Sequence, residues 1–244
     1  MYQQFARLGL CLSSVFLAAA YAEPGKAVYG PLVEKGEAEF ELVYGQFTGG
    51  AEDGGWAMLA EANYGVTDWW MAEVQFEFER EPGENAILEA IEFENVFAFN
   101  TSRAWPVQFG AALAYEFGLR DKPDEVEAML IAERHSGPMR LRGNLITERQ
   151  VGSGAEDEFE FGYAAQLLYA LNDDVSLGAE GYGGAGSDEE FADFADEAHY
   201  WGPVAQFELP DFGGGESEIQ IGYLAGFGET EADGYIQLKL ELEY

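Results

Sequence analysis

The last nine residues, 236–244, alternate apolar and polar side chains without a break. One face carries four aliphatic residues and ends on Tyr244, while the other face is polar and charged. Period two is typical of a β-strand whose two faces meet different surroundings. In a membrane strand those surroundings are lipid and a wet interior.

The same alternation recurs along the chain and predicts about twelve strands. The expected segments are 37–46, 55–64, 69–79, 87–99, 106–117, 125–134, 139–148, 158–170, 174–183, 199–209, 217–227 and 236–244. Segments of about ten residues fit strands that cross a membrane at a tilt. An even number of strands returns both chain ends to one side; ten strands is the alternative count.

The turns between the segments predict which side of a membrane each end faces. Compact turns such as 65–68, 135–138 and 171–174 alternate with longer Gly-, Asp- and Glu-rich connections. Two connections on the compact side, 100–105 and 210–216, are expected to be longer. Short periplasmic turns and longer outer loops are typical of transmembrane barrels.

A chain that ends in an amphipathic strand with a terminal aromatic resembles Gram-negative outer-membrane β-barrels. The resemblance implies an all-β, antiparallel up-and-down transmembrane β-barrel in the bacterial outer membrane. It also implies that Tyr244 takes part in recognition by the barrel assembly machinery. The turn regions 64–68 and 169–173, which begin with the strand-end residues Tyr64 and Tyr169, resemble those of porin-like barrels, including the meta-pathway phenol-degradation family. An acidic periplasmic β-sandwich is the soluble alternative, but it would not place aromatics on one face of strand after strand.

The N-terminus predicts a secretory signal peptide over residues 1–22. Arg7 precedes an apolar stretch at 8–20, and Ala20-Tyr21-Ala22 is an A-x-A cleavage site. A membrane anchor is the alternative, but the apolar stretch is too short to span. The mature chain, 23–244, is then a single barrel domain without cysteine, because Cys11 is the only one.

The charge of the chain is strongly negative. The net charge is −34, and removal of residues 1–22 leaves 11 basic and 46 acidic residues, a net charge of −35. Nucleic acid is therefore disfavoured as a partner. Cations, small solutes and a divalent-rich lipopolysaccharide surface are favoured. An acidic proteome from a saline habitat explains the charge equally well.

The inward faces of the expected strands carry many carboxylates and few cations. An acidic lumen attracts cations, as charged rings do in pores; the alternative is that these groups only hydrate the interior. The candidate lumen and selectivity residues are Glu39, Glu41, Glu61, Glu73, Glu77, Glu92, Glu94, Glu116, Glu133, Arg140, Arg142 and Glu160. Glu133 and Arg140 flank the 135–138 turn, which predicts that they oppose each other as a structural ion pair or a constriction.

The connection at 188–197 is a candidate divalent-cation loop, because hard cations prefer oxygen ligands. Its carboxylates are Asp188, Glu189, Glu190, Asp193, Asp196 and Glu197. The spacing is not that of an EF-hand, and a solvated acidic loop is the alternative. Contact with divalent ions that bridge lipopolysaccharide is the sharper hypothesis.

Catalytic groups are scarce in this sequence. The two histidines, His135 and His199, make a weak zinc site, and no set of nucleophile, base and orienting group can be assembled. The G-x-G-x-x-G match at 181–186 lacks a βαβ context. We therefore expect no enzyme and no cofactor, although outer-membrane lipid hydrolases of this size keep a third option open.

A passive, cation-preferring outer-membrane channel is the function that the sequence favours, with its substrate unknown. The alternative is a structural or accessory barrel whose lumen is blocked by side chains or by residues 23–35. Small inward residues are expected to leave space and to favour the channel. They are Gly110, Ala112, Ala114, Gly162, Ala164, Gly178 and Gly222.

Overall fold

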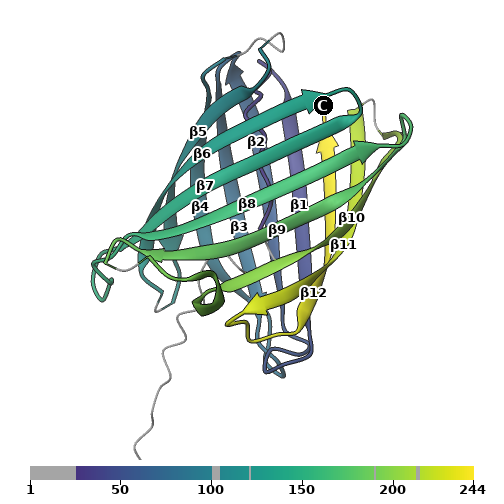
Figure 1. Cartoon of the computed structure of the whole chain (residues 1–244). Coiled ribbons are helices and arrows are strands. Elements are labelled where there is room, and N and C mark those ends of the chain that lie inside the picture. Colours follow the sequence, from purple (N-terminus) through teal and green to yellow (C-terminus); the bar gives the residue numbers. More distant parts are fainter. Residues whose placement is uncertain (1–25, 101–104, 121, 190, 213–214) are drawn as a thin grey trace, which may run out of the picture.

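The protein is a closed barrel of twelve antiparallel strands (Figure 1). The computed structural model describes residues 26–100, 105–120, 122–189, 191–212 and 215–244. The strands are β1 (Ala38–Thr48), β2 (Trp56–Thr67), β3 (Trp70–Arg80), β4 (Ile87–Ala98), β5 (Gln108–Gly118), β6 (Asp124–Ser136), β7 (Met139–Val151), β8 (Glu160–Ala170), β9 (Val175–Ser187), β10 (Ala198–Phe212), β11 (Gly215–Gly228) and β12 (Gly234–Glu243). The predicted fold class and the predicted count of twelve are confirmed.

Each strand pairs with its neighbours in sequence, and β1 closes the ring by pairing with β12. The closing register places Leu42 opposite Leu240. Ala38 and Tyr244 exchange two backbone hydrogen bonds, of 3.0 and 2.8 Å. We call the end of the barrel where β1 begins and β12 ends the terminal rim, and the opposite end the loop rim. The C-terminus marks the terminal rim (Figure 1).

The outer surface of the barrel is apolar, as the period-two pattern predicts. Large apolar side chains that stay exposed occur on every strand. Phe93, Leu113, Leu145 and Ile236, for example, expose 51, 55, 66 and 53% of their area. Their sequence neighbours point inward and are mostly buried. An apolar outer band with a polar interior is the arrangement that a lipid bilayer requires.

The connections at the two rims differ in length. At the terminal rim, β2 and β3 are joined by residues 68–69, β6 and β7 by 137–138, and β8 and β9 by 171–174. The prediction of a long connection at 210–216 is wrong, because β10 extends to Phe212 and β11 starts at Gly215. The terminal rim has one long connection, between Ala98 of β4 and Gln108 of β5, as expected near 100–105. Connections at the loop rim are mostly longer than the compact turns, up to residues 188–197. This loop contains the 3₁₀ turn η2 (Phe194–Asp196).

The hairpin of β6 and β7 corrects a predicted contact. Ser136 pairs with Met139, so the turn holds only Gly137 and Pro138, and Glu133 lies opposite Arg142 rather than Arg140. Gly137 has φ +60°, the conformation that a type II′ turn needs at its first central position. The expected four-residue turn would have shifted the register by two residues.

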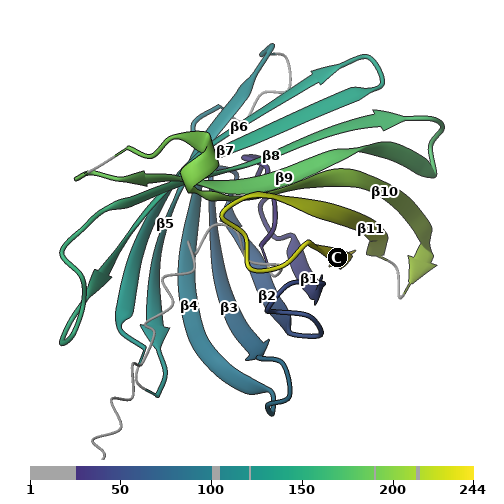
Figure 2. The same ribbon diagram turned by 60° about the horizontal axis from the view of Figure 1, so that its bottom comes forward.

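Residues 26–33, which we call the inner segment, lie inside the ring of strands (purple in Figure 2). Ala27, Val28, Pro31 and Val33 are buried. The segment reaches the terminal rim at a turn where Gly36 N donates to Gly65 O at 2.7 Å. In the described ranges, no helix is long and apolar enough to cross a membrane. The predicted signal peptide, 1–22, lies outside the described residues.

We predict that Val74→Arg destabilises the barrel by about 2–4 kcal/mol in a bilayer, because an arginine near mid-strand would meet lipid. Val74 lies on the outer face of β3, in register with Ala62 and Phe93. Gln75→Arg is the matched control, since Gln75 points inward between Glu61 and Glu92. Urea unfolding in lipid vesicles measures both. Equal losses would contradict the assignment of the two faces.

Removal of Tyr244 should lower the amount of folded barrel, because the residue joins the closing pair through its backbone and exposes its ring. Tyr244→Lys keeps the backbone bonds but puts a charge at the outer surface. Tyr244→Phe keeps both the bonds and the aromatic ring. We expect deletion and lysine to reduce heat-modifiable protein in outer membranes, and phenylalanine to preserve it. Normal levels of the deletion variant would contradict this expectation.

Candidate functional site: an acidic lumen occupied by the inner segment

The inner segment is held to the barrel wall through its backbone. Asn144, on β7, accepts a hydrogen bond from Tyr29 N at 2.9 Å and donates one to Tyr29 O at 3.0 Å. On β12, Gln237 donates to Lys26 O at 3.2 Å. These bonds matter because a segment outside the β-sheet must otherwise leave buried backbone groups unpaired.

Apolar side chains of the segment pack into three clusters along the lumen. Val28 packs with Ala164, Leu224 and three tyrosines. Val33 packs with Val96, Ala112 and Ile131, among others. Ala27 packs with Val43 and Leu59. The inner face of this barrel is thus partly apolar where the segment lies.

Three of the small inward residues, Gly110, Ala112 and Ala164, make room for this segment, which corrects the expectation that they leave an open path. A Cβ added at Gly110 would lie 3.0 Å from Pro31 Cβ. Ala112 belongs to the cluster around Val33, and Ala164 belongs to the cluster around Val28. The space predicted from these residues exists, but the chain itself fills it.

The predicted lumen carboxylates lie on the inner side of the wall. Tyr29 of the inner segment donates to Glu61 at 2.9 Å. Seven of the predicted glutamates are buried, namely Glu41, Glu61, Glu73, Glu92, Glu94, Glu116 and Glu133. Glu39, Glu77, Arg140, Arg142 and Glu160 are partly exposed. Cross-strand registers bring like charges together, as in Glu73 opposite Glu94 and Glu92 opposite Glu116.

Lysines are the counter-charges of this acidic interior. Lys239 Nζ lies 2.6 Å from Glu41 and 3.4 Å from Glu241. Lys122, from the loop between β5 and β6, lies 3.1 Å from Glu116. Lys26 shares with Lys122 a small cavity that is lined by Glu77, Glu92, Glu116, Glu125, Glu127 and Glu148. Lys26 and Lys122 could not be predicted from the alternation of the strands, because neither lies in a strand.

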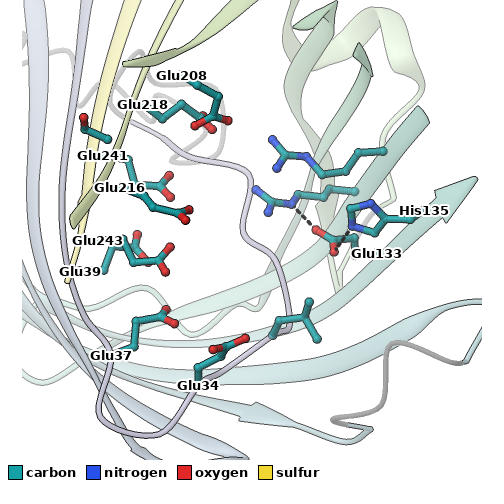
Figure 3. Close-up of a pocket in the computed structure, with 14 residues that line it drawn as sticks. Glu34, Glu37, Glu39, Glu133, His135, Glu208, Glu216, Glu218, Glu241 and Glu243 are labelled. Atoms are coloured by element: carbon teal, nitrogen blue, oxygen red, sulfur yellow. Dashed lines mark hydrogen bonds and ion pairs between the residues drawn. The ribbon is translucent and has the colours of Figure 1, made fainter. Parts of the chain in front are cut away.

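Free space inside the barrel is unequally divided. The cavities that border Lys26 have volumes of about 20, 30 and 20 Å³, which is roughly the room that one water occupies. A larger cavity of about 280 Å³ opens at the terminal rim (Figure 3). We call it the terminal cavity.

Opposite charges line the terminal cavity. Figure 3 shows Glu133 and His135 on one side, across from a wall of glutamates that lies on β1, β10, β11 and β12. The acidic wall includes Glu39, Glu208, Glu216, Glu218, Glu241 and Glu243. The side with Glu133 also carries Arg142, whose Nε donates to Glu133 at 2.5 Å. His135 Nε2 lies 2.7 Å from the other oxygen of Glu133.

Arg140 also lines this cavity, but it has a different partner from the predicted one. Its guanidinium donates to Gln206 Oε1 at 2.8 Å. The Gln206 amide donates in turn to Glu218. A neutral amide thus separates the arginine from the acidic wall, and in the described part of the chain Arg140 forms no ion pair.

Burial and neighbouring carboxylates raise the pKa of several glutamates at the two rims, outside the strands. Burial, together with the nearby Glu243, raises the pKa of Glu37 to about 7 at the terminal rim. The negative charge of the terminal cavity therefore grows as the pH rises through that value. At the loop rim, burial and Glu231 raise the pKa of Glu52, and burial and Glu229 raise that of Glu197.

The candidate divalent-cation loop lies at the loop rim. Asp188 accepts a bond from Phe159 N at 2.9 Å, and Asp193 O accepts one from Asp196 N at 2.8 Å. Glu197 O accepts one from Glu229 N at 3.0 Å. Glu190 lies outside the described residues, and cation binding by this loop, including Glu189, stays a prediction.

One group of carboxylates in the described chain lies close enough to share an ion. It consists of Glu39, Glu41 and Glu241, with ligand oxygens within 4.8 Å of one another. The ammonium of Lys239 contacts two of the three. This lysine therefore already supplies the positive charge at that position.

The two histidines lie at opposite rims, so the described structure does not bring them together as a zinc site. His135 contacts Glu133 at the terminal rim. His199 lies near the loop rim, 3.0 Å from the Tyr163 hydroxyl and 2.9 Å from Phe194 O. Both contacts are compatible with structural roles.

Comparison with known proteins identifies the fold. No family model matches the sequence, and no curated protein matches it either; the resemblance to the meta-pathway phenol-degradation family stays a prediction. Among solved structures, the chain is similar to the NanC porin, with a TM-score of 0.58 and 10% identity over 84% of this chain and 98% of that one.

The chain is also similar to two further solved structures of outer-membrane proteins. An outer-membrane channel from Pseudomonas putida F1 has a TM-score of 0.58 and 13% identity, over 91% of this chain and 99% of that one. The KdgM porin has a TM-score of 0.52 and 7% identity, over 84% and 98%. The chain therefore has the fold of a bacterial outer-membrane β-barrel.

Proposed function

We propose that this protein is a passive outer-membrane channel for small solutes, with a cation-preferring lumen. The observation that carries the proposal is the row of inward carboxylates that runs from one rim of the barrel to the other. It begins with Glu39 at the terminal rim and continues through Glu61 and Glu94 to Glu148 near the loop rim. A barrel built only for stability would gain more from apolar or neutral side chains at these positions.

Charge balance supports the sign of the selectivity. The cations that contact the interior are Lys26, Lys122, Lys239, Arg140 and Arg142. Seven predicted glutamates are buried, and further glutamates line the terminal cavity and the small cavity beside Lys26. Rings of carboxylates favour cations in a pore and repel anions.

The inner segment closes the channel in this conformation. The cavities beside Lys26 are each about the size of a single water. A solute can pass only when residues 26–33 leave their place. The hydrogen bonds of this segment to Asn144 and Gln237 then help to determine the fraction of channels that are open.

The segment also supports a second candidate function, a structural or accessory barrel with a permanently blocked lumen. Its three apolar clusters and its backbone bonds are contacts that a permanent filler would have. The two candidates differ in conductance. In either case, we propose that lipid and lipopolysaccharide surround the barrel, and that divalent ions at the 188–197 loop contribute to the lipopolysaccharide contact.

The ion selectivity of the protein in a planar bilayer tests the channel proposal. A salt gradient should give a reversal potential of the sign expected for cation preference. The preference should fade at high salt, since the Debye length falls to about 3 Å at 1 M. Anion preference would contradict the assigned role of the lumen glutamates.

Deletion of residues 26–33 should raise the conductance several-fold, because it removes the obstacle. Asn144→Ala should raise the open fraction by roughly fivefold or more, because it removes two hydrogen bonds worth about 0.5–1.5 kcal/mol each. Leu145→Ala is the matched control, since Leu145 is 66% exposed on the outer face. If the deletion variant folds but carries no current, the blocked structural barrel is the better account.

A further inference from the structure

The terminal cavity has the features of a binding site for a small molecule with charges of both signs. Its volume of about 280 Å³ is near the lower end of the roughly 300–1,000 Å³ found for small-molecule sites. The inner segment ends beside the cavity, since Leu32 and the following residue Glu34 form part of the cavity lining. A solute that enters from the terminal rim therefore meets this cavity before it meets the segment.

Arg140 is the one element of the cavity that an acidic channel does not explain. Arg142 is matched by Glu133 at 2.5 Å, so that pair is close to neutral. Arg140 instead bonds a neutral amide, Gln206. A guanidinium has five donors in a fixed fork and matches a carboxylate with two parallel bonds. Arg140 thus retains a positive charge that a carboxylate of a solute would complement.

The opposite wall of the cavity determines which charged groups the solute should carry besides a carboxylate. Glu39, Glu208, Glu218 and Glu241 lie across from the side that carries Glu133 and His135 (Figure 3). Carboxylates in this number favour ammonium groups and disfavour a solute with net negative charge. One carboxylate and more than one cationic group is the combination that suits both walls.

We infer that the terminal cavity binds small amino acids with a cationic side chain, with the carboxylate on Arg140 and the ammonium groups on the glutamate wall. The inference rests on the proposed function for its role in transport, because it gives a substrate class to the channel. Binding itself depends only on the cavity, so it can be measured without any current.

Equilibrium binding to the full-length barrel in detergent micelles tests the inference. The probes are L-lysine, cadaverine, which lacks the carboxylate, and L-glutamate, which reverses the net charge. Calorimetry should give lysine at least about tenfold tighter binding than cadaverine, because a single hydrogen bond to a charged group is worth that factor or more. Glutamate should not bind measurably.

Arg140→Gln should weaken lysine binding by about tenfold and leave cadaverine binding equal or tighter. Arg149→Gln is the matched control, because Arg149 pairs with Asp157 at the loop rim and should change neither affinity. Heat-modifiable migration checks that each variant is folded. Cadaverine binding as tight as that of lysine, a lysine affinity that Arg140→Gln leaves unchanged, or no binding of either amine would each overturn the inference. If the channel conducts but fails this binding test, the proposed function stands and the inference is rejected. If lysine binds but the protein does not conduct, the inference on binding stands and the channel proposal is rejected.

Discussion

Every backbone polar group of a membrane strand needs a partner, because lipid offers none. The pairing of β1 with β12 meets this requirement for the last two open edges. It also fixes the register of the ring, so that Phe40 points outward while Glu41 points inward. The closing pair therefore determines both the apolar outer band and the acidic lumen.

A closed lumen with so many carboxylates must still be filled and balanced in charge. The inner segment does both: Val28 and Val33 pack against apolar wall residues, and Lys26 lies among glutamates. Like charges directly opposite each other in a sheet are destabilising, so a lysine in this position stabilises the barrel. The same packing closes the path, and stability and closure are therefore coupled.

Period-two alternation was enough to predict the class of fold, the twelve strands and their outward faces. The Glu133–Arg142 contact could not be predicted, because it depends on the number of residues in the turn at Gly137, and a four-residue turn fits the sequence equally well. The small residues Gly110 and Ala164 predicted free space, but their pattern does not say what occupies it. The inner segment lacks periodicity, so its position depends on specific partners such as Asn144.

Amide hydrogen exchange at Tyr29 tests the central claim, that residues 26–33 occupy the lumen, most directly. Tyr29 N bonds Asn144 inside the barrel at 2.9 Å, so its exchange in lipid should be slowed by orders of magnitude relative to an unstructured amide. Asn144→Ala should remove much of that protection without affecting strand amides. An exchange rate at Tyr29 equal to that of an unstructured peptide would contradict the account.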